Sequence, residues 1–364
     1  MISKLRLNNF RNFKTKLLDF SPEITVIVGP NASGKTNILE SIFLLSTGKS
    51  FRAHLEEEMV NYDTDISRAK GRTKSDGELT DLEAILTRGL IDIGKSAPEK
   101  IARKKLLVNG VAKRLIDFAG NFRVALFGPW DLDLVTESPS LRRKFLDSVL
   151  SQVNREYHRS SLSYEKGLRQ RNRLLLRIRD EGLSRGQLLF WNRLLVKNGD
   201  YIARTRGELI DFINSASSSF QLPISNYQLE YDKSAISEGR LEQYAEEEVA
   251  AGTTLVGPHR DDFIFQKLKN SKTQKLESRD LSRFGSRGEQ RMSILWLKLA
   301  ELAFIEEKTG ERPTLLLDDI FSELDHKHRD IVKKVSENQQ TIITTADPHF
   351  IEGFKKVEKI KLGG

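Results

Sequence analysis

Hydrophobic and polar positions near the start of the chain predict a strand, a loop and a helix in that order. Leu5 and Leu7 alternate with polar neighbours, which predicts a strand with one buried face. The unbroken apolar run Ile24–Val28 predicts a strand buried on both faces. After a glycine-containing segment, apolar residues recur at the spacing of one helical face. These residues are Ile38, Leu39, Ile42 and Leu45.

Residues 50–127 show shorter apolar runs that are separated by turn sequences, which is typical of strands joined by tight connections. We expect this portion to form an antiparallel layer beside the main sheet. The turns are predicted at Ser75-Asp76-Gly77, Asn109-Gly110 and Gly128-Pro129.

Long helical periods begin after residue 138. Ser140 is predicted to cap a helix that opens at Leu141, and the chain to about Ile213 is expected to be helical and rich in arginine. An acidic, weakly patterned tract follows. Strand and turn signals return at Thr253–Pro258.

The last part of the chain returns to alternating helices and strands. Apolar residues on one helical face lead toward Pro313, and Thr314–Leu317 and Thr341–Thr345 are predicted to be buried strands. The chain therefore divides into a head, residues 1–138 and 252–364, and a mostly helical insert, residues 139–251. The apolar residues of the helix before Pro313 are Met292, Leu295, Leu299 and Leu302.

Composition narrows the class of protein. The 364 residues allow two domains, and 38% hydrophobic with 30% charged residues is typical of a soluble globular protein. The chain has no cysteine, which excludes disulfides, thiol catalysis and cysteine-based metal sites. The first residues lack a long apolar segment and no apolar run would span a bilayer, so a soluble intracellular protein is expected.

Positive charge is concentrated in the insert. The net charge is +8, and residues 141–210 alone hold 16 Lys and Arg against 7 Asp and Glu. A local basic segment is typical of a protein that binds a phosphate backbone. A helical pair with solvated arginine faces explains the charge equally well, and both interpretations stay open at this point.

Gly29–Thr36 matches the Walker A pattern at every fixed position. The pattern needs glycines so that backbone N–H groups wrap the phosphates, while Lys35 reaches the terminal phosphates and Thr36 offers a hydroxyl to Mg²⁺. A buried strand precedes the segment and an amphipathic helix follows it, so ATP or GTP binding is predicted. The predicted nucleotide residues are Gly29, Pro30, Asn31, Ala32, Ser33, Gly34, Lys35 and Thr36.

A second half of this site lies 283 residues beyond Lys35. An apolar strand ends at Asp318 and Asp319. Asp318 is predicted to hold Mg²⁺ together with Thr36, and Asp319 is predicted to orient or deprotonate the attacking water. A buried strand followed by acidic turn residues is the alternative.

Two further segments carry a family resemblance. Ser286–Gln290 opens a predicted helix, and Ser322–Asp325 follows Asp319 directly. This order of signature, helix, Walker B and D-loop resembles ABC-type ATPase heads, and Asn9–Phe13 resembles the branch with SMC, Rad50 and RecF proteins. The chain has no heptads for a long coiled coil. It is most similar to the RecF family through Lys49–Arg52, Ser138–Asp147, Leu168–Asn172 and Gly257–Asp262.

The resemblance covers effectively the whole chain and implies an α/β fold. It implies an ABC-type P-loop head with a mixed sheet and an inserted, mostly helical arm. Two copies would sandwich two ATP molecules, with Ser286 and Gly288 of one copy on the phosphates of the other. Ser286 with Glu289 also fits a plain helix-capping box, and this alternative stays open. The resemblance also implies that Arg11 lies near the nucleotide, and the alternative is a plain surface arginine.

Three positions depart from the family pattern. Glu289 stands where glutamine is usual, Trp130 stands where an acidic residue is usual, and Thr345 ends the strand at which related transporters have a histidine. Glu289 implies weaker dimer closure or slow hydrolysis, and Thr345 implies slow turnover. His259 and Arg260 have a functional role by resemblance, or form a turn that locks the insert onto the head. The other histidines lack metal-ligand spacing, so no zinc site is predicted.

The resemblance implies an ATP-dependent DNA-binding protein of recombinational repair and replication restart, with slow, DNA-stimulated ATP hydrolysis. It implies a cytoplasmic, nucleoid-associated protein that uses ATP and Mg²⁺, with RecR, RecO and RecA as partners at DNA gaps. The alternative is a DNA-binding adaptor that ATP switches without hydrolysis. The arm residues predicted to contact DNA phosphates are Arg142, Arg143, Lys144, Arg169, Arg171 and Arg173.

Overall fold

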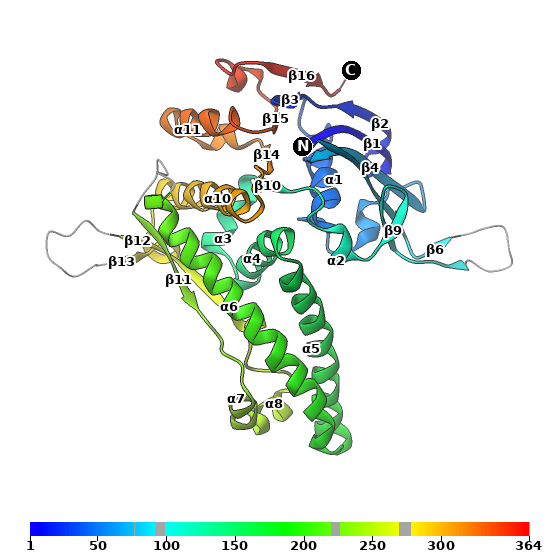
Figure 1. Cartoon of the computed structure of the whole chain (residues 1–364), viewed down its shortest axis with the longest axis vertical. Helices are drawn as coiled ribbons and strands as arrows, with labels where there is room; N and C mark the ends of the chain where they lie inside the picture. The colour runs from blue at the N-terminus through cyan, green and yellow to red at the C-terminus, as the bar shows by residue number, and fades with distance from the viewer. Residues whose placement is uncertain (76, 92–98, 220–225, 269–277, 364) are drawn as a thin grey trace, which may run out of the picture. The chain divides into compact units, whose positions relative to one another are not determined.

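The structure, a computed structural model, describes the whole chain except residues 76, 92–98, 220–225, 269–277 and 364 (Figure 1). The chain forms two compact units. One contains Met1–Pro129 with Thr309–Gly364, and the other contains Trp130–Lys308.

A parallel sheet lies in the first unit, with strand order β10-β14-β15-β3-β16. Strand β3 is an interior strand and pairs with β15 on one side and with the edge strand β16 on the other. The register places Val28 beside Thr345 and Asp318 beside Thr344. The carboxyl-terminal ends of β3, β14 and β15 therefore lie next to one another. The strands are β3 (Ile24–Val28), β10 (Val124–Phe127), β14 (Thr314–Asp318), β15 (Thr341–Thr345) and β16 (Val357–Lys361).

An antiparallel sheet with order β2-β1-β4-β5-β8-β9 forms a second layer of this unit. This layer was predicted and is confirmed. Asn109 and Gly110 both have positive φ, which suits the tight turn between β8 and β9. The strands are β1 (Ile2–Phe10), β2 (Phe13–Asp19), β4 (Ile66–Ser75), β5 (Glu78–Thr87), β8 (Lys104–Val108) and β9 (Val111–Lys113), with β6 (Leu90–Ile91) and β7 (Glu99–Lys100) as a separate pair.

Helix α1 (Lys35–Thr47) contacts strands of both sheets. Its apolar residues Ile38, Leu39 and Ile42 are fully buried, which explains the helical spacing found in the sequence. The other helical segments of the unit are η1 (Glu56–Met59), α2 (Leu115–Phe118), η5 (Ile320–Glu323), α11 (His326–Ser336) and η6 (Pro348–Ile351).

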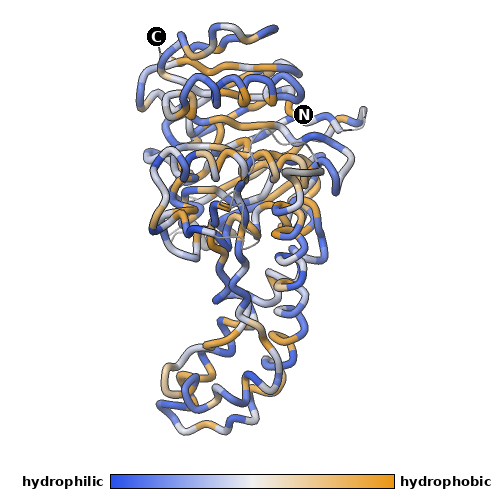
Figure 2. The backbone as a smooth tube through the Cα atoms, turned by 90° about the vertical axis from the view of Figure 1, so that its left-hand side faces the viewer, coloured by the Kyte–Doolittle hydropathy of each residue, from blue (hydrophilic) through white to orange (hydrophobic). Residues whose placement is uncertain are grey.

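The second unit is built on long helices. Helices α5 (Arg155–Glu181) and α6 (Leu189–Ser219) contact each other along the arm, and α4 (Pro139–Val153) contacts both. At 27 residues, α5 is about 40 Å long. Figure 2 shows hydrophobic positions that recur along these helices, as expected for helices with one buried face.

A three-stranded sheet and shorter helices complete the second unit. The sheet has the order β11-β12-β13, and its strands are β11 (Tyr227–Asp232), β12 (Asp262–Leu268) and β13 (Ser278–Asp280). Helix α10 (Arg287–Thr309) is the longest of the remaining helices. The others are η2 (Pro129–Leu132), α3 (Asp133–Thr136), η3 (Arg185–Leu188), α7 (Glu238–Gln243), α8 (Ala245–Ala251), η4 (Pro258–Arg260) and α9 (Leu281–Phe284).

Two local predictions were wrong. Helix α4 begins at Pro139 after Ser138, not after Ser140, because proline suits the first helical position, where no N–H partner is needed. Thr253–Pro258 forms bends and the start of a 3-10 turn and contains no strand. The turn predicted at Ser75-Asp76-Gly77 includes Asp76, which lies outside the described residues.

The compact units do not coincide with the predicted head and insert. Residues 130–138 and 252–308, assigned to the head from motifs, belong to the same compact unit as the long helices. The division based on motifs stays a prediction. Among the described residues, no helix is both long and apolar enough for a membrane span.

Candidate nucleotide-binding site

The loop Gly29–Thr36 joins the end of β3 to the start of α1. Gly34 has φ +98°, and a Cβ there would lie 2.6 Å from the Phe13 ring. A Cβ on Gly29 would lie 2.6 Å from the carbonyl oxygen of Leu362. Both glycines are therefore required by the backbone path, and they leave the first N–H groups of α1 free for an anion.

The Lys35 side chain is bound within this loop. It is 7% exposed, and its Nζ donates to the carbonyl oxygens of Gly29 at 2.7 Å and Pro30 at 2.9 Å. Within the described part of the chain, the buried hydroxyl of Ser33 has no hydrogen-bond partner. A buried ammonium group, an unpaired hydroxyl and a helix N-terminus together form a site that fits phosphate groups.

Thr36 and Asp318 join the two halves of the site. The Thr36 hydroxyl donates to Asp318 Oδ2 at 2.7 Å across 282 positions of sequence, and Thr344 donates to Oδ1 of the same carboxylate. Asp318 is 4% exposed. A hydroxyl and a carboxylate beside a phosphate loop are the oxygen ligands that Mg²⁺ prefers, so these residues fit this ion.

Asp319 follows in a left-handed conformation with φ 50°, and its N–H donates to the carbonyl of Thr344 at 3.1 Å. Burial is the main cause that raises the pKa of Asp319, and the neighbouring Asp318 carboxylate adds to it. A raised pKa moves a carboxylate toward the range in which it can accept a proton from water. Thr345 ends β15, and its hydroxyl donates to the carbonyl of Asp347 at 3.1 Å.

Arg11 is bound by a buried carboxylate that the sequence reasoning missed. Its guanidinium donates to both oxygens of Glu40, at 2.9 and 2.7 Å, and Glu40 also accepts from Arg52 and Ser50. Burial alone would raise the pKa of Glu40, but these hydrogen bonds outweigh it and the pKa is lowered. Glu40 lies on the opposite face of α1 from Ile38, Ile42 and Leu45, where a charged residue is ordinary, so the sequence held no clear signal of its burial.

Ser286 and Gly288 lie at the exposed start of α10, in the second compact unit. Glu289 N donates to Ser286 Oγ at 3.3 Å, and Ser286 N donates to Glu289 Oε2 at 2.8 Å. The capping box that was left open as an alternative is therefore confirmed as the local structure. The role of Ser286 toward a second copy stays a prediction.

Two of the arginines predicted to contact DNA are buried structural residues. Arg142 is 9% exposed and donates to both carboxylate oxygens of Asp262. Arg171 is 1% exposed and donates to Glu248 at 2.6 Å. Both predictions were wrong, because these guanidiniums are enclosed by protein partners and do not face the solvent.

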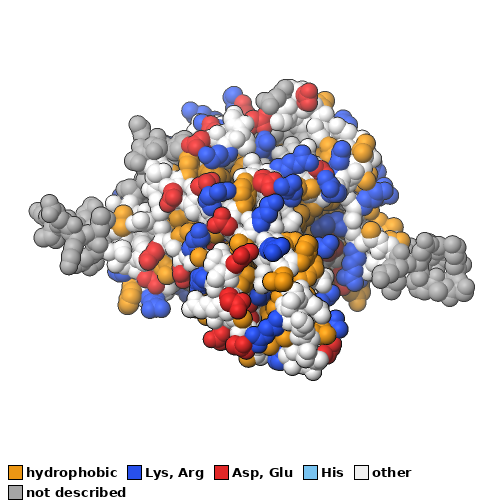
Figure 3. All heavy atoms as spheres, turned by 60° about the horizontal axis from the view of Figure 1, so that its bottom comes forward, with side chains coloured by type: hydrophobic (Ala, Val, Ile, Leu, Met, Phe, Trp, Pro, Cys, Tyr) orange, Lys and Arg blue, Asp and Glu red, His pale blue; other side chains and the backbone are white. Residues whose placement is uncertain are grey.

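The other four arm candidates remain accessible to different extents. Arg143 is half-buried and donates to the carbonyl of Asp261, whereas Lys144, Arg169 and Arg173 are exposed. Arg169 pairs with Glu165 one helical turn earlier. In Figure 3, Lys and Arg side chains are interspersed with Asp and Glu side chains on the face that it shows, which argues against a purely basic surface there.

His259 belongs to a turn that is fixed within the second unit. Tyr164 Oη lies 2.8 Å from His259 Nδ1, and His259 Nε2 lies 3.0 Å from the carbonyl oxygen of Thr254. Burial lowers the pKa of His259 to about 4, so the ring is neutral at physiological pH. Nearby, Arg206 donates to the fully buried Asp261 at 3.0 Å. These contacts hold the turn against α5 and α6.

A basic face on the antiparallel sheet was also missed. In β4, exposed Arg68, Lys70 and Arg72 alternate with buried residues, and in β1 Lys4 and Arg6 stand opposite Arg72 and Lys70. Asp81 pairs with Lys70 and Arg72, Glu83 pairs with Arg68, and Asp19 pairs with Lys4, so these five cations of β1 and β4 stand against three carboxylates. The strict alternation of basic and non-basic residues over Arg68–Arg72 was the signal for it.

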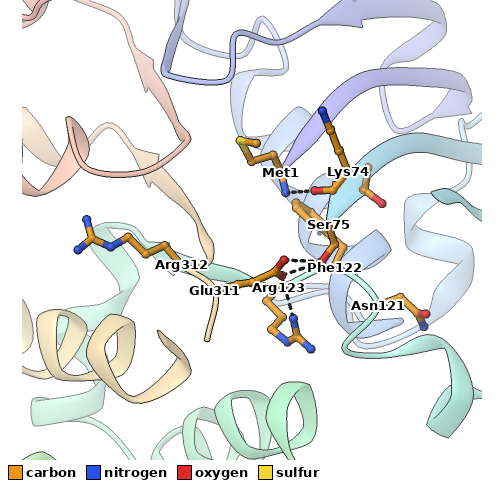
Figure 4. Close-up of a pocket in the computed structure, with 9 residues that line it drawn as sticks. Met1, Lys74, Ser75, Asn121, Phe122, Arg123, Glu311 and Arg312 are labelled. Atoms are coloured by element: carbon orange, nitrogen blue, oxygen red, sulfur yellow. Dashed lines mark hydrogen bonds and ion pairs between the residues drawn. The ribbon is translucent and has the colours of Figure 1, made fainter. Parts of the chain in front are cut away.

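A small pocket near the first residue has a structural role (Figure 4). The Met1 amine donates to the carbonyl oxygen of Lys74 at 2.9 Å. Glu311 accepts hydrogen bonds from Ser75 at 2.7 Å and Arg123 at 3.3 Å. These contacts tie β4 to the segments before β10 and β14, and the pocket contains none of the phosphate-loop residues.

The phosphate loop and the Thr36–Asp318 pair together define a P-loop protein. A family model for the RecF/RecN/SMC N-terminal domain matches residues 1–363. The DNA replication and repair protein RecF of Herpetosiphon aurantiacus is 35% identical, over 95% of this chain and 93% of that protein. The chain belongs to the RecF family of DNA replication and repair proteins.

Two solved structures are similar to this one. A structure of the recombination mediator protein RecF with ATP, from the RecFOR pathway, has a TM-score of 0.84 at 31% identity and covers 99% of this chain and 95% of that one. An Smc head domain from Pyrococcus furiosus has a TM-score of 0.52 at 15% identity, over 100% of this chain and 94% of that one. The second likeness shows the fold alone.

Proposed function

We propose that this protein binds ATP with Mg²⁺, closes into a dimer on DNA and hydrolyses ATP slowly, in recombinational repair and replication restart. The observation that carries the proposal is the hydrogen bond from Thr36 to Asp318 beside the poised Lys35. It joins a complete phosphate loop to a carboxylate from the far end of the chain. The RecF relative solved with ATP supports ATP as the nucleotide.

Each residue of the site has one task in this proposal. Lys35 leaves the carbonyls of Gly29 and Pro30 and binds the terminal phosphates. Thr36 and Asp318 hold Mg²⁺, which supplies positive charge to the phosphate oxygens. Asp319 orients the attacking water and accepts its proton, a role that its raised pKa supports.

Dimerisation places the start of α10 of one copy on the nucleotide of the other. Ser286 and Gly288 are exposed, and an exposed helix N-terminus attracts negative charge. The γ-phosphate adds the charge that favours the closed dimer, and its loss on hydrolysis releases the dimer. Arg11 is held by Glu40 next to the loop, which supports a position near the nucleotide.

DNA binding rests on the exposed cations of two surfaces. Lys144, Arg169 and Arg173 provide one, and the basic face of the antiparallel sheet around Arg6 and Lys70 provides the other. Contacts to phosphates imply weak sequence preference and an affinity that falls steeply with salt. The partners in this proposal are RecR, RecO and the RecA recombinase at single-strand gaps, in the bacterial cytoplasm at the nucleoid.

Sizing the protein with ATP and with ADP, each with and without duplex DNA, tests the proposal. We expect dimers with ATP and monomers with ADP. Lys35→Ala should abolish nucleotide binding, because the phosphates lose their ammonium partner. Ser286→Arg should keep nucleotide binding but form no ATP-dependent dimer. If Ser286→Arg forms as much ATP-dependent dimer as wild type, the arrangement in trans is refuted.

A second candidate function is an adaptor that ATP switches without hydrolysis. Thr345 favours it, since its hydroxyl is tied to Asp347 and no histidine ends β15. Phosphate release with DNA, compared between wild type and Asp319→Asn, separates the two. Release that DNA stimulates in wild type and that Asp319→Asn abolishes supports the ATPase. Absence of DNA-stimulated release in wild type supports the adaptor.

A further inference from the structure

The signature carboxylate Glu289 is held between two cations. Lys267 Nζ lies 2.8 Å from Glu289 Oε1, and Arg279 Nη2 lies 2.6 Å from the same oxygen. The side chains are 35%, 38% and 22% exposed for Lys267, Arg279 and Glu289, so water screens these contacts only in part. The three groups together carry one net positive charge.

The two cations come from directly opposite positions of one strand pair. Lys267 in β12 is the register partner of Arg279 in β13. Like charges that face each other across an antiparallel pair destabilise it unless a counter-ion lies between them. Glu289, from the first turn of α10, supplies that counter-ion. Ion pairs through Glu289 therefore link the β12–β13 strand pair to the start of α10.

Glu289 also has a fixed place at the start of the helix. Its second oxygen accepts the N–H of Ser286 at 2.8 Å, and the hydrogen bonds from Lys267 and Ser286 lower the pKa of Glu289 to about 2. The carboxylate is thus ionised at every physiological pH. Beside Ser286 and Gly288, an ionised carboxylate without counter-ions would repel an incoming anion.

We propose that Lys267 and Arg279 are specificity residues of the signature site, which neutralise Glu289 so that the start of α10 accepts the triphosphate held by a second copy of this chain. The inference rests on the ATP-dependent dimer proposed above. Removing both cations changes the local charge from one positive to one negative. The capping hydrogen bond between Ser286 and Glu289 is retained.

The test combines removal of the cations with removal of the charge that they neutralise. We expect the double variant Lys267→Ala/Arg279→Ala to bind ATP like wild type, since the phosphate loop is unchanged. Its dimerisation in saturating ATPγS, a slowly hydrolysed analogue, should weaken by about tenfold or more, because like charges at an interface are strongly unfavourable. Adding Glu289→Gln should restore dimerisation to within about threefold of wild type, because glutamine still completes the capping box. Sedimentation velocity over a protein concentration series gives the dimer dissociation constants.

Lys308→Ala is the matched control. It removes a cation from the other end of α10, where Lys308 pairs with Glu307, and it should dimerise like wild type. A triple variant as weak as the double variant would overturn the inference, because the cations would then act independently of Glu289. A double variant equal to wild type would overturn it as well. Wild type that stays monomeric with ATPγS would instead refute the proposed dimer, and the inference with it.

Discussion

Arg171→Ala should destabilise the second compact unit strongly, because it leaves a buried charge without its partner. The Arg171 guanidinium donates to Asn192 at 2.7 Å, to Thr254 at 2.8 Å and to Glu248 at 2.6 Å. Arg171 is 1% exposed and Glu248 is fully buried. In the variant, Glu248 keeps the N–H of Leu255 but loses its cation.

Breaking one side of a buried ion pair costs about 3–5 kcal/mol, more than a surface substitution, which stays within about 0.5 kcal/mol. Arg173→Ala is the matched control, since Arg173 is exposed two residues farther along the same helix. Replacing the pair together, as Arg171→Met/Glu248→Leu, should recover most of the loss, because no uncompensated charge remains.

Urea unfolding followed by circular dichroism measures these differences, with DNA affinity measured on the same samples. We expect Arg171→Ala to lower the unfolding midpoint and Arg173→Ala to leave it unchanged. Without urea and at low salt, Arg173→Ala should weaken DNA binding. Equal stability of the two single variants would refute the structural role of Arg171, as would a double variant no more stable than Arg171→Ala.

Two further predictions concern a histidine and a glycine. The pKa of His259 is lowered to about 4 in the folded protein. In the unfolded chain this histidine has its usual pKa near 6.5. At pH values below about 6.5 the unfolded chain therefore binds a proton that the folded chain does not, and stability falls as the pH drops from about 6.5 toward 4. Chemical unfolding across this pH range should show a shallower loss for His259→Gln, and an identical slope would contradict the burial argument. Gly34→Ala should weaken binding of a fluorescent ATP analogue by about tenfold or more, since it combines φ +98° with a Cβ 2.6 Å from the Phe13 ring. Gly239→Ala is its control, because a Cβ at Gly239 meets nothing within 4 Å, and equal affinity of the two variants would argue against a strained loop.

Features that depend on neighbouring residues were predictable from the sequence. The strand, loop and helix around Lys35 follow from local patterns, and so does the buried strand that ends at Asp318. The capping box of Ser286 and Glu289 needs only four successive residues. In each of these cases the residues that determine the structure lie within one helical turn or one strand.

Burial of charged side chains was not predictable in this way. Arg142 and Arg171 look like surface arginines on basic helices, yet their carboxylate partners lie 120 and 77 positions away. Only the tertiary structure brings Asp262 and Glu248 to them. The same reason hid the charge balance at Glu289, whose Lys267 partner is on a separate strand.

The interior place of β3 in the parallel sheet has a consequence for synthesis of the protein. Ile24–Val28 is made early, but its two neighbours, β15 and β16, lie at residues 341–345 and 357–361. At bacterial and eukaryotic elongation speeds the apolar strand waits roughly 15–65 s for them. During this time its unpaired edges are available to other nascent chains or to chaperones. The phosphate loop that follows β3 is thus among the first parts made and among the last to acquire its native surroundings.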